Sequence, residues 1–440
     1  MKFETIKSIL LVVLVTISIF LTWSTWKYKP DLDVSDKPQT HQMQIAELRE
    51  PAELIMPIRL LYHIDGEHYG SVKAYDIKNL IGQISRWNLF RIEGPRTLSN
   101  EEIATLSQSN NRIEIMYPDL VPFDIYKSII NIQSDDVPRA SFNRIVINLD
   151  YKGQDAAAIY FISTIDGRVF ESNIDPERIT QLIQYTRDNK KEFDQYEAVE
   201  LADGRIRFLL SEEKELKRYK YYTNNIDVSK FQEVLFSDPD KVRRDFVKTG
   251  EKFTDDSSFM NVDYMSNMIS YVYPGNELKT EDILRNNDIL KKSIDYINEH
   301  KGWTDNYRYF NIGEYDQRVS FQLFMDDYPV FNDKGMTQFR LSWGAEGIFK
   351  YNRPYFSFDI DLPGELIIKL PSGTTVLDYL MTDPDFKPEL MQDLMIGYRL
   401  GKDPNNAQVY TLEPSWYYLY AGSWLPVDPI DIRGKFNGLE

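Results

Sequence analysis

Hydrophobic positions along the chain form one continuous run near the N-terminus and short periodic segments further on. The run, residues 6–26, would span roughly 31 Å as a helix, which is the thickness of a hydrocarbon core. Its aliphatic positions favour insertion strongly enough to outweigh the few serines and threonines. The run therefore predicts a transmembrane helix. Its aromatic and basic interface anchors are Trp23, Trp26, Lys27, Tyr28 and Lys29.

The same run has a competing interpretation as a secretory signal peptide that is removed. Its apolar core is longer than a typical signal core, and no cleavage pattern of small residues follows it. We therefore expect residues 1–29 to form a cytoplasmic tail and a single membrane-spanning helix. Lysines flank the run on both sides, so charge does not decide the orientation. The length of the C-terminal part favours a cytoplasmic N-terminus and an extracellular bulk of the chain.

Residues 30–49 are polar and lack an apolar period, which predicts a juxtamembrane linker. The apolar patterns that follow are separate from the membrane helix. We therefore expect residues 45–440 to fold without it.

Residues 50–195 carry the signals of a first α+β domain. Residues 58–62 predict a strand, and Ile77, Leu80, Ile81 and Ile84 follow at helical spacing. Strict alternation over residues 142–150 predicts a half-buried strand. Local signals mark further boundaries: a capping box at Ser99 and Glu102, a hairpin turn at Asp166 and Gly167, and an N-cap at Asp175 before Pro176.

Residues 196–275 predict a middle α+β domain, with strands at 206–210, 219–223, 259–264 and 268–273 and a helix around 230–236.

Residues 276–440 predict a C-terminal α+β domain. Thr280 is the expected N-cap of a helix that carries Leu290, Ile294 and Ile297 on one face. Strands follow at short spacing, together with a short helix near residues 389–395 and a hairpin around residues 421–422. The predicted fold class is thus α+β: a transmembrane helix followed by three small extracytoplasmic α+β domains with mainly antiparallel sheets.

Composition limits the functions that this chain can have. Of its residues, 42% are hydrophobic, which is enough for such cores, and none is cysteine. Disulfides, thiol catalysis and zinc–thiolate sites are therefore excluded. A net charge of −17 argues against nucleic acid as a partner, because phosphate binding needs a basic surface.

Catalytic motifs are absent from the sequence: there is no nucleophile elbow, metalloprotease helix, phosphate-binding loop or dinucleotide fingerprint. His63 and His68, with two carboxylates between them, could suit a divalent metal, but polar residues around an Asp-Gly turn are usually solvated. Adjacent acidic pairs such as Asp326–Asp327 and Asp255–Asp256 are expected from composition alone. Aromatic clusters such as residues 307–310 and 416–418 indicate sheet packing more often than sugar binding. We expect no enzyme activity, no metal and no cofactor.

One organised feature lies within the predicted membrane helix. Six positions spaced three and four apart lie on one face of this helix. Their side chains are smaller and more polar than those of the opposite face, which is typical of helix–helix contacts in lipid. We call these positions the transmembrane stripe: Ser8, Leu11, Val15, Ser18, Thr22 and Thr25. The alternative is that serine and threonine are merely tolerated in a single-pass anchor.

Taken in order, several segments resemble the YycH family of membrane-anchored regulators of the WalK (YycG) sensor histidine kinase in Gram-positive bacteria. The carriers are the anchor and its exit, the strand at 142–150 (FNRIVINLD), the run at 235–239 (LFSDP) and the segments between 319 and 351. The resemblance covers nearly the whole chain.

The resemblance implies a non-enzymatic extracytoplasmic regulator that helps to control cell-wall metabolism. It implies a complex with a WalK/YycG-type kinase and a YycI-like membrane protein, with contacts made partly through transmembrane helices. The sign of regulation does not carry over, because it differs among members. The alternative function is a cell-wall-binding or wall-modifying ectodomain, which the exposed location and the abundant Tyr and Trp would suit.

Overall fold

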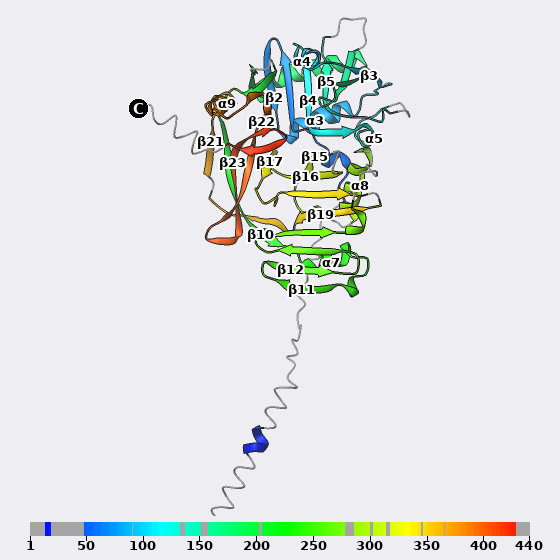
Figure 1. Ribbon diagram of the computed structural model, residues 1–440. Coiled ribbons are helices and arrows are strands. Elements are labelled where there is room, and N and C mark those ends of the chain that lie inside the picture. Colours follow the sequence, from blue (N-terminus) through cyan, green and yellow to red (C-terminus); the bar gives the residue numbers. More distant parts are fainter. Residues whose placement is uncertain are drawn as a thin grey trace, which may run out of the picture. The chain divides into compact units, whose positions relative to one another are not determined.

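The computed structural model describes residues 14–18, 48–89, 91–132, 137–150, 157–201, 205–277, 286–299, 302–313, 317–344, 346–364 and 366–427 (Figure 1). Residues 14–18 are helical, and Leu14, Val15 and Ile17 are about half exposed. Within these ranges, no helix combines the length and the apolar character that crossing a bilayer requires. The rest of the predicted membrane helix, and the predicted linker up to residue 47, lie outside the described residues.

The first part of the chain folds around an antiparallel sheet that has nine strands within the described residues, in the order β3-β7-β6-β5-β4-β1-β2-β8-β9. The strands are β1 (Arg59–Ile64), β2 (Glu67–Ser71), β3 (Glu93–Thr97), β4 (Arg112–Pro122), β5 (Ser141–Asn148), β6 (Ala157–Ile162), β7 (Arg168–Ile174), β8 (Asp194–Glu200) and β9 (Ile206–Leu210). The helices are α2 (Pro51–Leu54), α3 (Ala74–Ile84), α4 (Asn100–Gln108), α5 (Phe123–Tyr126), α6 (Pro176–Asn189) and the 3-10 turn η1 (Lys190–Glu192).

Strand β5 is covered on both faces, so the expectation of a half-buried strand was wrong. Ile145 and Ile147 belong to the main core, together with Leu80 of α3. Val146 points the other way, is fully buried and packs with Ile103 of α4 in a separate small cluster. The error arose because polar residues alternate along this segment, while its second face is sealed by a helix that lies far away in sequence.

Local signals in this region are confirmed. Ser99 accepts a hydrogen bond from the backbone N–H of Glu102, whose carboxylate accepts one from the Ser99 N–H, and together they start α4. Asp175 caps α6 by accepting from the Glu177 N–H. Gly167 sits in the turn between β6 and β7 at a φ of +75°, which favours glycine.

The second part of the chain forms a larger sheet that has 15 strands within the described residues, antiparallel except for the β17–β22 pair. Its main order is β11-β12-β13-β14-β19-β18-β16-β17-β22-β23-β10-β20, with β15 on β16, β21 on β10 and β24 on β23.

These strands are β10 (Lys214–Asn225), β11 (Arg243–Val247), β12 (Gly250–Thr254), β13 (Phe259–Asp263), β14 (Met268–Val272), β15 (Tyr307–Gly313), β16 (Arg318–Met325), β17 (Tyr328–Phe331), β18 (Gln338–Trp343), β19 (Ile348–Pro354), β20 (Phe356–Asp361), β21 (Leu366–Leu370), β22 (Met391–Asp403), β23 (Asn406–Tyr420) and β24 (Ser423–Pro426). The helices are α7 (Val228–Leu235), α8 (Asn286–Glu299) and α9 (Gly373–Leu380), with the 3-10 turns η2 (Pro239–Lys241), η3 (Pro274–Asn276) and η4 (Pro388–Leu390).

Part of this sheet buries one face and leaves the other accessible. In β13, Met260 is fully buried and the next residue, Asn261, is exposed. In β14, Ile269 is fully buried and the next residue, Ser270, is half-buried. Helix α8 packs into the core that the buried face of this sheet forms. Its buried residues there include Leu290, Ile294 and Ile297. The predicted inward face of α8 is therefore confirmed, while its predicted N-cap, Thr280, lies outside the described residues.

The predicted helix near residues 389–395 was wrong. The chain makes only the short turn η4 there and then enters β22, which pairs with β23 along most of its length. Long-range strand pairing therefore overrides the local preference in this segment.

The fold is α+β with mostly antiparallel sheets, as the sequence predicts. Residues 45–440 form one compact unit. The predicted boundary at 195/196 falls inside β8, and the one at 275/276 falls inside η3. The division into three domains stays a prediction.

Candidate functional site

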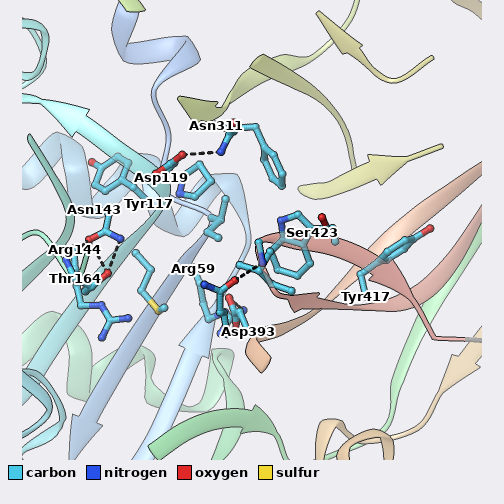
Figure 2. A pocket seen from close by; sticks show the side chains of 18 of the residues that line it. Arg59, Tyr117, Asp119, Asn143, Arg144, Thr164, Asn311, Asp393, Tyr417 and Ser423 are labelled. Carbon is cyan, nitrogen blue, oxygen red and sulfur yellow. Dashed lines mark hydrogen bonds and ion pairs between the residues drawn. The ribbon is translucent and has the colours of Figure 1, made fainter. Parts of the chain in front are cut away.

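A cleft with a volume of ≈ 1960 Å³ lies where the two sheets meet. One side is lined by residues of β1, β4, β5, α4 and the start of β9, and the other by residues of β15, β16, β18 and β22 to β24. Figure 2 shows side chains from both sheets converging on this space. The cleft is therefore built by residues that are far apart in sequence.

A buried ion pair joins the two sheets at the cleft. Arg59 of β1 is 5% exposed, and its guanidinium lies 3.1 Å from Oδ2 of Asp393 on β22. Arg59 also donates to Oδ1 of Asp393 and to the carbonyl oxygen of Leu394. Figure 2 shows Arg59 and Asp393 directed toward one another. A guanidinium that reaches two acceptors on one strand fixes the relative position of the two sheets.

A second connection lies on the other side of the cleft. Oδ2 of Asp119, in β4, accepts hydrogen bonds from Asn311 Nδ2 at 2.8 Å and from the Ile312 N–H at 2.9 Å (Figure 2). The hydroxyl of Tyr309 donates to the carbonyl of Leu120. Strands β4 and β15 are therefore held together by directional bonds in addition to the apolar core to which both contribute, among others Leu120 and Ile312.

Glu114 is the most buried charged group of the cleft lining, at 1% exposure. One of its oxygens lies 3.1 Å from Arg144 and the other 2.9 Å from Nε2 of His63. Burial raises the pKa of Glu114, but Arg144, His63 and Arg59 together lower it below its usual value. The carboxylate is therefore ionised at neutral pH. Arg144 and His63 contact it, and Arg59 acts on it only through its charge.

The two histidines form a chain that ends on Glu114. Because an ionised carboxylate only accepts hydrogen bonds, Nε2 of His63 must carry a hydrogen. Nδ1 of His63 then faces Nδ1 of His68 at 2.8 Å, and both rings pack against Phe208. Burial, followed by the neighbouring His63, lowers the pKa of His68. Both nitrogens of His63 are thus occupied by protein groups, which does not suit a metal ligand.

All basic residues that line the described part of the cleft are arginines: Arg59, Arg144, Arg205, Arg207, Arg318, Arg340 and Arg399. The acidic residues of the same lining are Glu101, Glu114, Asp119, Glu200, Asp333 and Asp393. Seven cations beside six anions make this lining much less acidic than the whole chain, whose net charge is −17. Arginine offers a planar fork of donors that matches carboxylate and phosphate groups.

The residues predicted to contact a partner in the membrane are mostly not described. Of the transmembrane stripe, Val15 and Ser18 lie in the helical residues 14–18, and the exposed fraction of Val15 is 50%. The other stripe residues and all the predicted interface anchors lie outside the described residues. Both assignments stay predictions.

The remaining candidate clusters have structural roles. Asp327 pairs with Arg308, and Asp255 accepts hydrogen bonds from the backbone N–H groups of Ser257 and Ser258. Tyr307 stacks on Phe339 in the core. The interpretation of the aromatic clusters as sheet packing is confirmed for this cluster.

Sequence reasoning missed the cleft and its ion pairs. Arg59 and Asp393 are 334 positions apart, and no local pattern connects them. One signal was available: Glu114 stands between Ile113 and Ile115 in an apolar strand, and a carboxylate in that position is usually paired when buried.

Comparisons with known proteins agree with this architecture. Residues 4–191 match the family described as YycH protein, N-terminal domain, and residues 205–433 match YycH protein, C-terminal domain. The two-component system WalR/WalK regulatory protein YycH of Bacillus subtilis (strain 168) is 22% identical over 462 residues, with 100% of both chains covered. The crystal structure of YycH from Bacillus subtilis has a TM-score of 0.73 at 19% identity, over 87% of this chain and 98% of that chain, and so has the same fold. The chain belongs to the YycH family.

Proposed function

We propose that this protein is a non-enzymatic regulator of a WalR/WalK-type two-component system. The observation that carries the proposal is that both YycH domains match, and together they cover nearly the whole chain. In addition, a relative described as a WalR/WalK regulatory protein aligns with this chain over the full length of both. Its effect on the kinase is either activating or repressing.

The chemistry of the cleft supports a binding role. His63 has both ring nitrogens engaged, and Glu114 is held ionised by cations. A general base needs a free lone pair within reach of a substrate proton. His63 and Glu114 are instead committed to one another and to His68 and Arg144, all within the nine-stranded sheet, which suits a structural role better than a catalytic one.

The finer proposal concerns location and partners. The protein is anchored by its N-terminal helix, with its bulk outside the cytoplasmic membrane, and it forms a complex with the kinase and a YycI-like membrane protein. The polar and small residues of the transmembrane stripe support helix contacts in lipid, where hydroxyls can bond across a helix pair. Regulation of cell-wall metabolism follows from the kinase.

Co-isolation tests the proposal. The tagged full-length protein is expressed in its own host, and membranes are solubilised in mild detergent. We expect the WalK-type kinase and the YycI-like protein to be recovered with it, in amounts well above those obtained with an unrelated single-pass protein carrying the same tag. Recovery of neither protein, with the tagged chain intact and inserted, would count against the complex.

A further inference from the structure

A row of polar side chains crosses seven adjacent strands on the accessible face of the larger sheet. Each residue lies directly opposite the next in the strand register. The row is Asn311 (β15), Ser320 (β16), Arg340 (β18), Asn352 (β19), Ser270 (β14), Asn261 (β13) and Lys252 (β12). At about 4.8 Å per strand it is roughly 29 Å long. We call these residues the polar row.

Most side chains of the polar row are available to a ligand, although the Asn311 amide already donates to Asp119. Ser320 is 5% exposed, and every other member of the row is half-buried or exposed. The two residues that flank each member along its own strand are buried. Along β18, for example, Arg340 is half-buried while Phe339 and Leu341 are fully buried. The row is therefore an outward sheet face made of amides, hydroxyls and cations.

The face carries positive charge on an acidic protein. Besides Arg340 and Lys252, the adjoining positions on the same face hold Arg318, Lys350 and Arg243. The acidic residues on this face along the same strands are Asp245 and Asp263, and Asp263 accepts a hydrogen bond within its own turn, from the Met265 N–H. Five cations against two anions attract an anion, although the whole chain has a net charge of −17.

Arg340 is the strongest candidate contact. Arg318 and Arg340 are diagonal neighbours on the same face of β16 and β18, since Arg318 lies opposite Ser342 and Arg340 opposite Ser320. Burial and the neighbouring Arg318 lower the pKa of Arg340. Within the described part of the chain, Nε of Arg340 is buried without a hydrogen-bond partner. An anion bound beside the half-buried guanidinium of Arg340 would therefore be attracted by its charge and by that of the neighbouring Arg318.

The row continues into the cleft. Asn311, Ser320, Arg318 and Arg340 all belong to the cleft lining, where more arginines converge. A linear ligand that lies along the row would thus have its end inside the cleft, next to the contacts that join the two sheets.

We propose that the polar row binds an extended phosphodiester polymer of polyol units, with phosphates on Arg340, Lys252 and the adjoining cations, and polyol hydroxyls on the amides and serines of the row. The cations of the face favour this ligand over a neutral glycan. The row itself offers no succession of aromatic rings on which single-stranded nucleic acid would stack, although one ring on β13, that of Phe259, adjoins the row under the Lys252 ammonium. The proposal goes beyond kinase regulation and does not depend on it.

Binding of a labelled poly(glycerol phosphate) chain of about ten repeats to the full-length protein in detergent micelles tests the proposal. We expect saturable binding that weakens steeply as salt is raised. Replacing two cations of the row, Lys252→Gln with Arg340→Gln, should weaken binding at least tenfold. The matched control, Arg96→Gln with Lys291→Gln, removes two exposed cations elsewhere and should change it less than twofold.

Because Arg340 is half-buried, a second pair keeps the test decisive if the first does not fold: Lys252→Gln with Lys350→Gln should also weaken binding, with the circular dichroism spectrum unchanged. Absence of polymer binding, or equal losses in the row and control variants, overturns the proposal. Equally tight, row-dependent binding of polyglutamate assigns the face to an acidic protein instead. Equally tight binding of a neutral chitooligosaccharide or of single-stranded DNA also overturns it.

Discussion

At the residue scale, the stability of the compact unit should depend on the ion pair between the sheets. Asp393→Ala leaves Arg59 buried without its partner and is expected to cost about 3 kcal/mol of unfolding free energy. Glu171→Ala removes the exposed partner of Arg96 and should cost less than about 1 kcal/mol. Urea unfolding of fragment 45–440 measures both. Similar losses of unfolding free energy for the two variants would show that the Arg59–Asp393 ion pair does not stabilise the contact between the sheets.

A second residue-scale prediction concerns pH. Burial raises the pKa of Asp305 to about 6, above its ordinary value of 3.8. A raised pKa in the folded state means that Asp305 contributes stability at low pH, and that this contribution is lost as pH rises from about 4 through 6. Asp305→Asn keeps an acceptor for the N–H of Phe358 and does not ionise.

The variant should therefore gain stability relative to the parent protein between pH 5 and pH 7.5, by about 1 kcal/mol. Urea unfolding of the fragment at the two pH values measures the difference. The exposed Asp188→Asn is the control for the substitution itself. A difference that is the same at both pH values, or that has the opposite sign, would show that burial does not raise the pKa of Asp305.

At the element scale, sequence signals identified the pieces that local chemistry decides. The capping box at Ser99, the N-cap at Asp175 and the hairpin at Gly422 were all found, because each depends on residues within a few positions. Helix α9 was missed, although Ser372 caps it by accepting from the Thr375 N–H. Its short apolar run offers less than three turns of periodicity.

The element-scale prediction concerns the membrane helix. Ser18→Leu with Thr22→Leu should leave insertion and ectodomain folding intact but weaken control of the kinase, because it removes hydroxyls worth about 0.6 to 2 kcal/mol each across a helix pair. Val13→Leu with Phe20→Leu lies off the stripe and should do little. Reporter expression from a kinase-dependent promoter is the readout. If both double variants regulate like the parent while correctly inserted, the ectodomain makes the contact instead.

At the scale of the whole molecule, the sequence predicted the α+β class but not the sheet orders. Strand β10 pairs with β20, β21 and β23, whose paired residues lie 131 to 193 positions away, and such pairings leave no local pattern. The cleft could not be predicted for the same reason, since it exists only where the two sheets meet. Family resemblance supplied the function that the residues alone did not.

The central claim is that this protein changes the activity of a WalK-type kinase. The kinase is placed in proteoliposomes with and without the full-length protein and the YycI-like protein, and its autophosphorylation rate is measured. We predict a change of several-fold in one direction, since a regulator must bind the two states of the kinase with different free energies. An unchanged rate, with all three proteins inserted in the correct orientation, would contradict the account.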